Sequence, residues 1–207
     1  AKREGFQRAA GTLVDRRYSD RGYDTPFRKQ DPNLFTFVAY DEGKLVGTTG
    51  IRLDSALGLN ADGLYKDELT VLREAGCKLC EFTRLAVDAA ISKPVLARLF
   101  HTAYLYAGAV HGCTFMVIEV IPRHAPFYHR ALGFEPIGAE RLNPSVNARG
   151  VLLCVSFRTI ADGLKRFGGK QREFPNEKSL FPYGFSPAEE AGILQRLKAL
   201  DAEQHAV

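Results

Sequence analysis

Several features that mark other protein classes are missing from this chain. It has no tryptophan and a single methionine, and none of its apolar runs is long enough to span a membrane. Its first residues lack the charged-then-apolar order of a secretion signal. Nucleic-acid-binding motifs are absent, and a net charge of +4 is too small to indicate a nucleic-acid partner. We therefore expect a cytoplasmic protein with no membrane segment and no nucleic-acid partner.

Cysteine is also scarce, with only Cys77, Cys80, Cys113 and Cys154. The spacing of Cys77 and Cys80 can begin a zinc site, but no second close cysteine or histidine pair follows. Three of the four lie on or beside apolar strand-like runs, where a free cysteine commonly packs as a small hydrophobic residue. We predict inert thiols and no metal site.

The length and composition are ordinary for one globular domain. The 207 residues are 45% hydrophobic and 25% charged, which is enough for a substantial core. We expect residues 1–207 to form one domain. Near its end, Ser186 and Glu189 have the spacing of a capping box with Pro187 at the first helical position. They predict a helix over residues 186–204 that packs on the domain or on a partner subunit, and the oligomeric state stays open.

The first half of the chain predicts a hairpin followed by a helical excursion. Residues 35–40 and 44–53 are rich in strand-forming residues and flank a short turn that ends at Gly43. Residues 54–79 then combine a loop with apolar residues at helical spacing, which indicates either an excursion that covers a ligand pocket or a plain surface helix. Apolar spacing also predicts an amphipathic helix over residues 6–23.

The second half alternates strands and helices. Residues 81–88 predict a strand, and Ser92 with Pro94 predicts the start of a helix that continues to residue 110. A final pair of strands is expected around residues 134–138 and 151–157. Residues 158–185 are rich in glycine, proline and basic residues, and indicate a loop.

One segment carries a complete strand, helix and strand pattern. Residues 115–121 are nearly all apolar and largely β-branched, which is typical of a strand buried on both faces. Pro126 suits the first turn of a following helix, where its missing N–H is not needed. Gly133 suits the left-handed position that closes the helix, and Phe134 begins a new extended run.

This segment, with Pro-Arg-His-x-x-Phe-Tyr-x-x-x-Leu-Gly-Phe over residues 122–134, resembles the late strand–helix–strand of the GCN5-related (GNAT) N-acyltransferases. The run Glu81-Phe-Thr-Arg84 is similar to the Glu-x-x-Arg strand of long-chain N-acyl amino acid synthases and of the related acyl-homoserine-lactone synthases. Residues 50–53, Gly-Ile-Arg-Leu, extend the resemblance. It implies an α+β fold of the GNAT type, with a central mixed β-sheet flanked by helices and splayed between the Glu81 strand and the Phe115 strand.

The resemblance also implies an activity. A long-chain acyl group would pass from an acyl-carrier-protein thioester to the α-amino group of an amino acid. The phosphopantetheine thioester is then a donor substrate, and no permanently bound cofactor is implied. An acyl-homoserine-lactone synthase stays open as an alternative, although it would need an S-adenosylmethionine site and the chain lacks the tryptophan of its amino-terminal motif. A catalytically inactive acyl-binding domain on the same fold also stays open.

Three residues are candidates for the chemistry. An amine that attacks a thioester must lose a proton, and Glu81 is the candidate base. The resemblance implies that Tyr128 lies near the leaving thiol, where a phenol can donate a proton, and His124 lies on the same helical face four residues earlier. Structural interpretations remain: a strand-edge carboxylate, a core tyrosine, and a histidine that caps the helix or meets solvent.

Arg52 and Arg84 are candidates for binding the acceptor's carboxylate, because guanidinium and carboxylate pair in a two-point fork. Ion pairing with Glu81 is the alternative. In a regular strand Glu81 and Arg84 point to opposite faces, so a shared pocket requires a β-bulge, a feature known in this strand of the superfamily. The resemblance further implies an early arginine followed by aromatic residues at the substrate site, for which Arg16 or Arg17 with Tyr18 is the nearest match.

The turn over residues 87–94 indicates the kind of donor. Acetyl-coenzyme A users of this fold have a glycine-rich loop here, whose backbone N–H groups bind the pyrophosphate. In this chain the turn has no glycine and contains an aspartate, which favours acyl carrier protein over coenzyme A. Lys93, Arg98, Arg123 and Arg130 lie around the same edge and are candidates for docking its acidic surface. Glu119, alone in the most apolar strand, is expected to have a structural partner such as an arginine.

Overall fold

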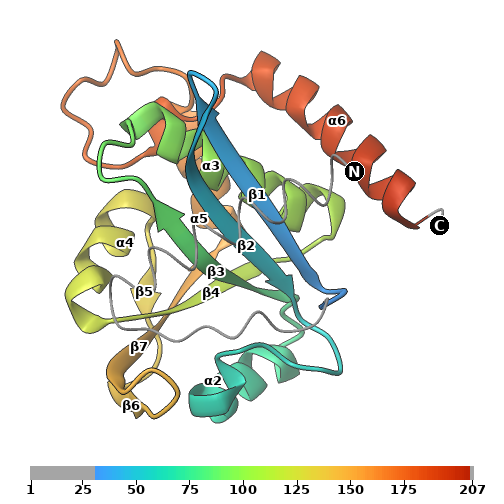
Figure 1. Cartoon of the computed structure of the whole chain (residues 1–207), viewed down its shortest axis with the longest axis vertical. Helices are drawn as coiled ribbons and strands as arrows, with labels where there is room; N and C mark the ends of the chain where they lie inside the picture. The colour runs from blue at the N-terminus through green and yellow to red at the C-terminus, as the bar shows by residue number, and fades with distance from the viewer. Residues whose placement is uncertain (1–30, 206–207) are drawn as a thin grey trace.

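The computed structural model of the chain describes residues 31–205, so the helix expected over residues 6–23, and Tyr18 with it, lie outside the described residues. The described part contains a mixed seven-stranded sheet of order β1-β2-β3-β4-β7-β5, with β6 paired to β7 (Figure 1). The strands are β1 (Leu34–Asp41), β2 (Lys44–Leu53), β3 (Leu79–Val87), β4 (Phe115–Val120), β5 (Glu135–Pro136), β6 (Arg141–Asn143) and β7 (Ala148–Ser156).

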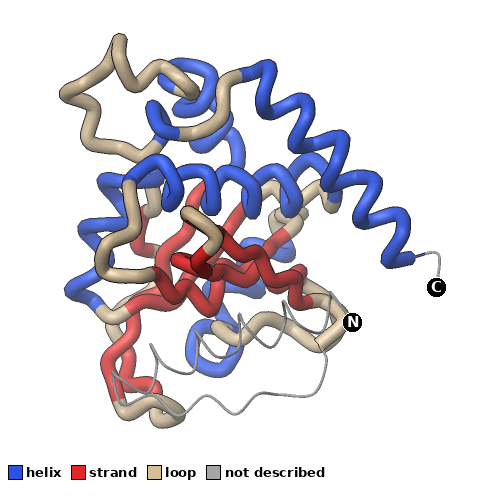
Figure 2. Tube along the Cα trace, turned by 45° about the horizontal axis from the view of Figure 1, so that its top comes forward, coloured by secondary structure: helices blue, strands red, loops and turns tan. Residues whose placement is uncertain are grey.

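Helices lie on both sides of this sheet, and Figure 2 shows the strands as a layer between them. They are α2 (Asp62–Glu74), α3 (Lys93–Leu105), the π-helical turn η1 (Tyr106–Val110), the 3₁₀ turn η2 (Pro122–His124), α4 (Ala125–Leu132), α5 (Phe157–Phe167), the 3₁₀ turn η3 (Phe181–Tyr183) and α6 (Pro187–His205). The α+β fold and the mixed sheet expected from the sequence are confirmed.

The alternation of side chains along β4 and β7 explains why both faces of the sheet are covered. On one face, α3, α4 and α5 enclose a core cluster that includes Met116 and Leu153. On the other face, Tyr65 of α2 packs in a cluster with Val117 and Leu152. Since successive strand residues point to opposite faces, apolar residues at every position bury both sides of these strands.

The two central strands part after a short contact. β3 and β4 run parallel and pair only at Leu79 with Phe115, Cys80 with Met116, and Glu81 with Val117. Beyond these pairs the strands diverge, as Figure 1 shows. The splay expected between the Glu81 strand and the Phe115 strand is therefore present, and Glu81 lies in the last pair before it.

The helix that follows β4 ends as the sequence predicts. Gly133 closes α4 with a φ of +78°, a left-handed conformation that glycine adopts without steric cost. The long helix predicted to residue 110 instead changes at its last turn into the π-helical η1. There Gly108 lies so close to Phe157 that an added Cβ would be 2.7 Å from the ring.

The loop predicted for residues 158–185 is wrong in its first part, because α5 begins at Phe157. Ser156 caps this helix, its hydroxyl accepting the Thr159 N–H at 3.0 Å. Ile160 and Leu164 continue the apolar stripe at helical spacing, which the glycine and basic content of the segment concealed. The short strand β6 was also not predicted.

The carboxyl-terminal helix α6 packs on the rest of the chain. Ser186 and Glu189 form the predicted capping box, with the Glu189 carboxylate accepting the Ser186 N–H at 2.8 Å. Leu197 is buried against Leu105 and Tyr106. The Tyr106 hydroxyl donates to Asp201 at 2.6 Å, which attaches the far end of α6 to η1.

Replacing a core leucine should show how much stability the sheet interior contributes. We predict that Leu152→Ala lowers the free energy of unfolding by about 2 to 5 kcal/mol, because Leu152 is fully buried in β7. Leu142→Ala on β6 is the matched control; its side chain is 59% exposed, so the change should stay within about 0.5 kcal/mol. Urea denaturation measures both. Equal losses would contradict the assignment of Leu152 to the core.

Candidate functional site

A β-bulge interrupts β3 just beyond Glu81. Between two consecutive residue pairs of the β2–β3 ladder, β3 has two residues, Arg84 and Leu85, whereas β2 has only Thr49. Arg84 has a φ of +52°, in the left-handed region. Leu85 packs against the same core cluster as Phe82, three residues away, so the bulge shifts the alternation of side chains by one. The bulge that a shared pocket for Glu81 and Arg84 requires is therefore present at Arg84.

Glu81 is a buried carboxyl group, only 4% exposed. Its Oε2 accepts the backbone N–H of Asn60 at 2.6 Å. The pKa of Glu81 is raised to about 7, chiefly by burial and to a smaller extent by the Glu119 carboxylate, against the opposing effects of the Asn60 N–H and the Arg52 charge. A carboxyl group that titrates near neutral pH both accepts and releases a proton readily, as a general base must.

The loop that supplies the Asn60 N–H is fixed by ion pairs. The Arg73 guanidinium on α2 binds Asp54 at 2.7 and 2.9 Å and Asp62 at 2.7 Å. Asp62 also accepts the Leu59 N–H at 2.7 Å. The excursion between β2 and β3 therefore covers Glu81, on the face of the sheet that α2 covers.

Arg52 lies opposite Glu81 on β2 as its Cα partner. One terminal nitrogen donates to the Asn60 side-chain oxygen at 2.6 Å, and the other lies 3.3 Å from an Asp31 carboxylate oxygen. Its Nε is buried and has no hydrogen-bond acceptor within residues 31–205. Arg52 thus stabilises the Asn60 loop, and its buried Nε–H remains available to a further acceptor.

A second carboxylate, Glu119, lies two residues beyond Val117 on β4, on the same face of the sheet as Glu81. Its Oε1 accepts from the Asn143 amide of β6 at 2.8 Å, so Glu119 has the expected structural partner, which is an amide and not the arginine given as the example. Gly150 of β7 makes the room, because a Cβ there would lie 2.4 Å from this oxygen.

Tyr128 and His124 lie just beyond the end of β4. Tyr128 is 7% exposed, and its ring packs edge-on against Phe134 at 5.9 Å and Phe127 at 5.2 Å. It belongs to the same core cluster as Phe82, the neighbour of Glu81. His124 is half-buried at the start of α4 and makes no side-chain cap to that helix.

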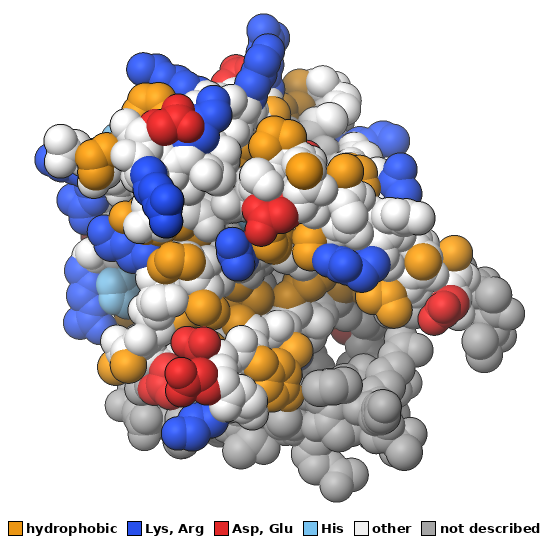
Figure 3. Space-filling view, turned by 90° about the horizontal axis from the view of Figure 1, so that it is seen from above, with side chains coloured by type: hydrophobic (Ala, Val, Ile, Leu, Met, Phe, Trp, Pro, Cys, Tyr) orange, Lys and Arg blue, Asp and Glu red, His pale blue; other side chains and the backbone are white. Residues whose placement is uncertain are grey.

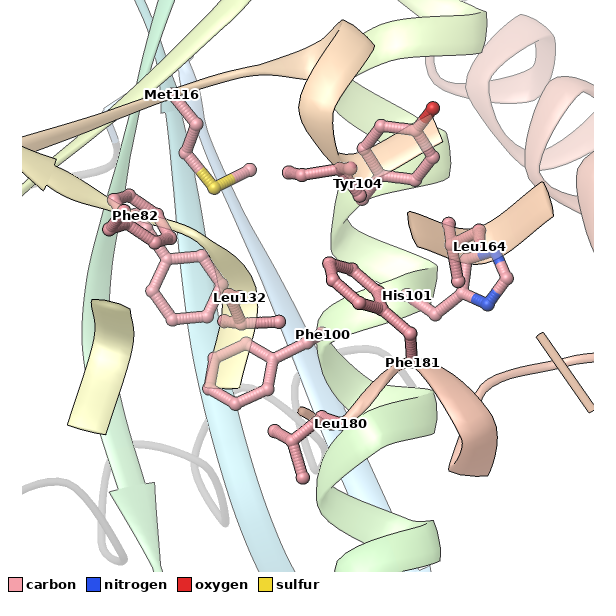
Figure 4. Close-up of a pocket in the computed structure, with 11 residues that line it drawn as sticks. Phe82, Phe100, His101, Tyr104, Met116, Leu132, Leu164, Leu180 and Phe181 are labelled. Atoms are coloured by element: carbon pink, nitrogen blue, oxygen red, sulfur yellow. The ribbon is translucent and has the colours of Figure 1, made fainter. Parts of the chain in front are cut away.

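An apolar cavity lies under the splay, on the α3 face of the sheet (Figure 4). Its volume is about 30 Å³ when measured as the space open to the centre of a water-sized sphere; all the space between atoms there, open solvent included, amounts to about 400 Å³. Phe82 of β3 and Met116 of β4 form one wall, and α3, α4, α5 and residues 180–181 supply the others. Cavities with such walls favour aliphatic groups, since apolar surface leaves water on binding.

The basic residues expected to dock a donor are all exposed. Lys93 lies over the Tyr183 ring at 5.7 Å, and Arg98 lies over the Phe185 ring at 5.6 Å. Arg98 also approaches Glu189 at 3.5 Å, while Arg123 sits on η2 at the end of β4. Figure 3 shows Lys and Arg side chains at the margins of the face seen from above and also within it, with a few acidic side chains among them.

Sequence reasoning missed Asn60, Arg73 and Asn143, since each acts on a residue far away along the chain. In residues 31–205 no three potential metal ligands lie together, and no helix there is long and apolar enough to cross a membrane. All four cysteines are free; Cys80, Cys113 and Cys154 are buried, and Cys77 is partly exposed.

Comparison with known proteins gives a family. A family model described as N-acyl amino acid synthase FeeM matches residues 9–156. The solved structure of FeeM, an N-acyl amino acid synthase from uncultured soil microbes, is 31% identical, covers 74% of this chain and 92% of its own, and superposes with a TM-score of 0.68.

Two more distant structures share the fold alone. TofI, solved with an inhibitor and MTA, is 15% identical, covers 75% of this chain and 88% of its own, and has a TM-score of 0.53. Escherichia coli ElaA is 12% identical, with coverages of 72% and 88% and a TM-score of 0.50. No curated protein sequence matches significantly.

The raised pKa of Glu81 predicts a dependence of stability on pH. Because the folded-state pKa is about 7 against an ordinary 4.5, the folded chain holds this proton more tightly than the unfolded chain. The free energy of unfolding therefore falls as pH rises through that window, and Glu81→Gln removes the fall. Between about pH 5 and about pH 8, the free energy of unfolding of the variant should rise by on the order of 2 to 3 kcal/mol relative to that of the unaltered chain.

Urea denaturation at both pH values measures this gain, with Glu140→Gln as the control because Glu140 is an exposed carboxylate. The control should follow the unaltered chain at both values. If the free energy of unfolding of Glu81→Gln changes with pH just as that of the unaltered chain does, Glu81 has an ordinary pKa.

Proposed function

The chain belongs to the N-acyl amino acid synthase family of acyltransferases, and from this premise we propose that it transfers a long-chain acyl group from an acyl-carrier-protein thioester to the α-amino group of an amino acid. One observation carries the proposal. Glu81 and Phe82 are neighbours at the splay, and their side chains point to opposite faces of the sheet. Glu81 accepts the Asn60 N–H on one face, and Phe82 lines the apolar cavity on the other. A thioester bound at the splay would have its acyl chain in the cavity and its carbonyl carbon within reach of an amine at Glu81.

The proposed reaction uses groups on both sides of the sheet. The neutral amine attacks the thioester carbon, and the new C–N bond forms as the carbonyl π electrons move to oxygen. Glu81 takes the proton that the nitrogen releases, directly or through one water molecule. Collapse of the intermediate breaks the C–S bond, and Tyr128 gives a proton to the departing thiolate. His124, one helical turn earlier, is the candidate to return that proton to Tyr128.

The acceptor's carboxylate is proposed to bind Arg52. The buried Nε of this residue has no acceptor among the described residues, and an unpaired buried donor is costly unless a ligand satisfies it. Arg52 is also the cross-strand neighbour of Glu81, which would hold the α-amino group close to the base. Arg84, at the bulge, is the second candidate for the same carboxylate.

The preference for a carrier protein is supported by the turn between β3 and α3. The Asp88 carboxylate accepts the Ala89 N–H at 3.1 Å, so one backbone donor of the turn is occupied and a negative charge stands beside it. A pyrophosphate would be repelled there. The exposed Lys93, Arg98 and Arg123 near the same edge suit a large acidic protein surface.

The product decides between the proposal and its alternatives. The purified chain would be incubated with long-chain acyl carrier protein and a mixture of amino acids, and the organic extract analysed by mass spectrometry. N-acyl amino acids support the proposal. Acyl-homoserine lactones, with S-adenosylmethionine supplied, would replace it by the lactone synthase, and acyl binding without any product would indicate a binding domain.

Replacing the proposed base should separate chemistry from docking. We predict that Glu81→Gln lowers kcat by about two to four orders of magnitude, because the attacking amine loses its proton acceptor. Affinity for the acyl carrier protein should be unchanged, since Glu81 is buried away from the docking surface. Single-turnover kinetics and surface plasmon resonance measure the two quantities, with Glu140→Gln as control. Near-normal turnover would remove Glu81 from the mechanism.

Donor choice should depend on salt. Matched acyl-carrier-protein and acyl-coenzyme A thioesters would be compared at about 0.05 M and about 0.5 M salt, where screening of surface charge differs strongly. We predict a higher kcat/KM for the carrier-protein form that declines as salt rises. Arg123→Glu should reduce it at low salt, and Arg149→Glu, an exposed arginine on β7, should not. A preference for the coenzyme A form at both salt concentrations would overturn the carrier-protein assignment.

A further inference from the structure

The apolar cavity is closed by a part of the chain that the family match does not include. The match ends at residue 156, and beyond it Ile160 and Leu164 of α5 and Leu180 and Phe181 line the cavity. Figure 4 shows the Phe181 ring pointing into the cavity from the side opposite Phe82 and Met116 of the sheet. We call residues 179–185 the strap, since they run from α4 to α3 across this side of the cavity.

Three contacts fix the strap to three helices. The Leu180 N–H donates to the Ala131 carbonyl of α4 at 2.9 Å. The Phe185 N–H donates to Nδ1 of His101 on α3 at 3.1 Å. On α5, Gly163 allows the Phe181 ring to lie directly on the helix backbone, because a Cβ there would be 2.5 Å from the ring. The position of Phe181 is therefore determined by its neighbours.

The His101 contact does not change near neutral pH. Burial lowers the pKa of His101 to about 4, so the ring is neutral there. Because Nδ1 accepts the Phe185 N–H, the ring proton is on Nε2, which lies 3.3 Å from a Glu190 carboxylate oxygen of α6. The buried imidazole thus holds the strap on α3 and lies beside the first turn of α6, where its Nε2 makes no hydrogen bond to residues 31–205.

We propose that the strap is the end wall of the acyl site and that Phe181 sets the longest acyl chain the protein accepts. The inference rests on the proposed function, because it takes the cavity as the place of the acyl chain. A chain that ends short of the ring leaves a void, and a longer one must displace a ring held against helix backbone. Selection by acyl length is then carried by residues outside the family match.

The test is the acyl-length profile of the enzyme. Saturated even-numbered acyl carrier proteins from octanoyl to stearoyl would be supplied to the unaltered chain, to Phe181→Ala and to Phe181→Leu. Both variants should move the preferred donor to longer chains, with the larger change in the alanine variant. Each additional buried methylene is worth about fourfold in affinity, so the ratio of kcat/KM for a long over a short donor should rise on the order of tenfold.

Two further variants complete the design. Leu164→Phe adds bulk to the same cavity and should move the preference to shorter chains. Phe174→Ala is the matched control, because Phe174 also lies beyond the family match but packs on Phe167 at 4.9 Å and does not line the cavity. If Phe181→Ala does not fold, Phe181→Leu and Leu164→Phe, which change the cavity in opposite directions, still test the inference.

A binding assay separates this inference from the proposed function. Free fatty acids of the same lengths would displace a fluorescent fatty acid from each variant. A shift of binding toward longer chains in Phe181→Ala or Phe181→Leu supports the end wall even if no variant transfers an acyl group, in which case the proposed function fails alone. Normal transfer with an unchanged length profile in all three cavity variants would overturn the end wall and leave the function intact.

Discussion

The parallel ladder between β3 and β4 is only three residue pairs long, and the candidate site depends on that shortness. Backbone N–H and C=O groups beyond the last pair have no partner across the gap between these strands, and such groups need another partner or water. A ligand that lies between the strands can supply it. The last pair also contains Glu81, so the candidate base stands at the point where the sheet opens.

Two opposing effects determine the character of Glu81. Burial and the neighbouring Glu119 favour its neutral form, whereas the Asn60 N–H and Arg52 favour its ionised form. The Asn60 N–H has its position because Arg73 holds both ends of the preceding loop through Asp54 and Asp62. A guanidinium that does not contact Glu81 therefore takes part in setting its proton affinity.

Sequence patterns predicted the elements whose causes are local. The hairpin of β1 and β2, the helix from residue 125 to 132 and its closure at Gly133 follow from turn and cap residues a few positions apart. The bulge was expected only through resemblance, since nothing at Arg84 itself requires it. The Asn60–Glu81 bond spans 21 residues and the Asn143–Glu119 bond spans 24, and side-chain partners at such separations depend on the completed fold. Helix α5 was missed because glycine and basic residues lie between the members of its apolar stripe.

Gly150 has a consequence for the electrostatics of the whole site. The Glu119 carboxylate occupies the volume that a side chain at residue 150 would fill, and Asn143 holds it there. Glu119 in turn contributes to the proton affinity of Glu81 on the other central strand. The position of a negative charge, and through it the balance between protonated and ionised Glu81, is thus controlled by excluded volume at a residue that has no side chain. The fit of the Glu119 side chain against β7 and the effect of its charge on Glu81 thus depend on the same residue, Gly150.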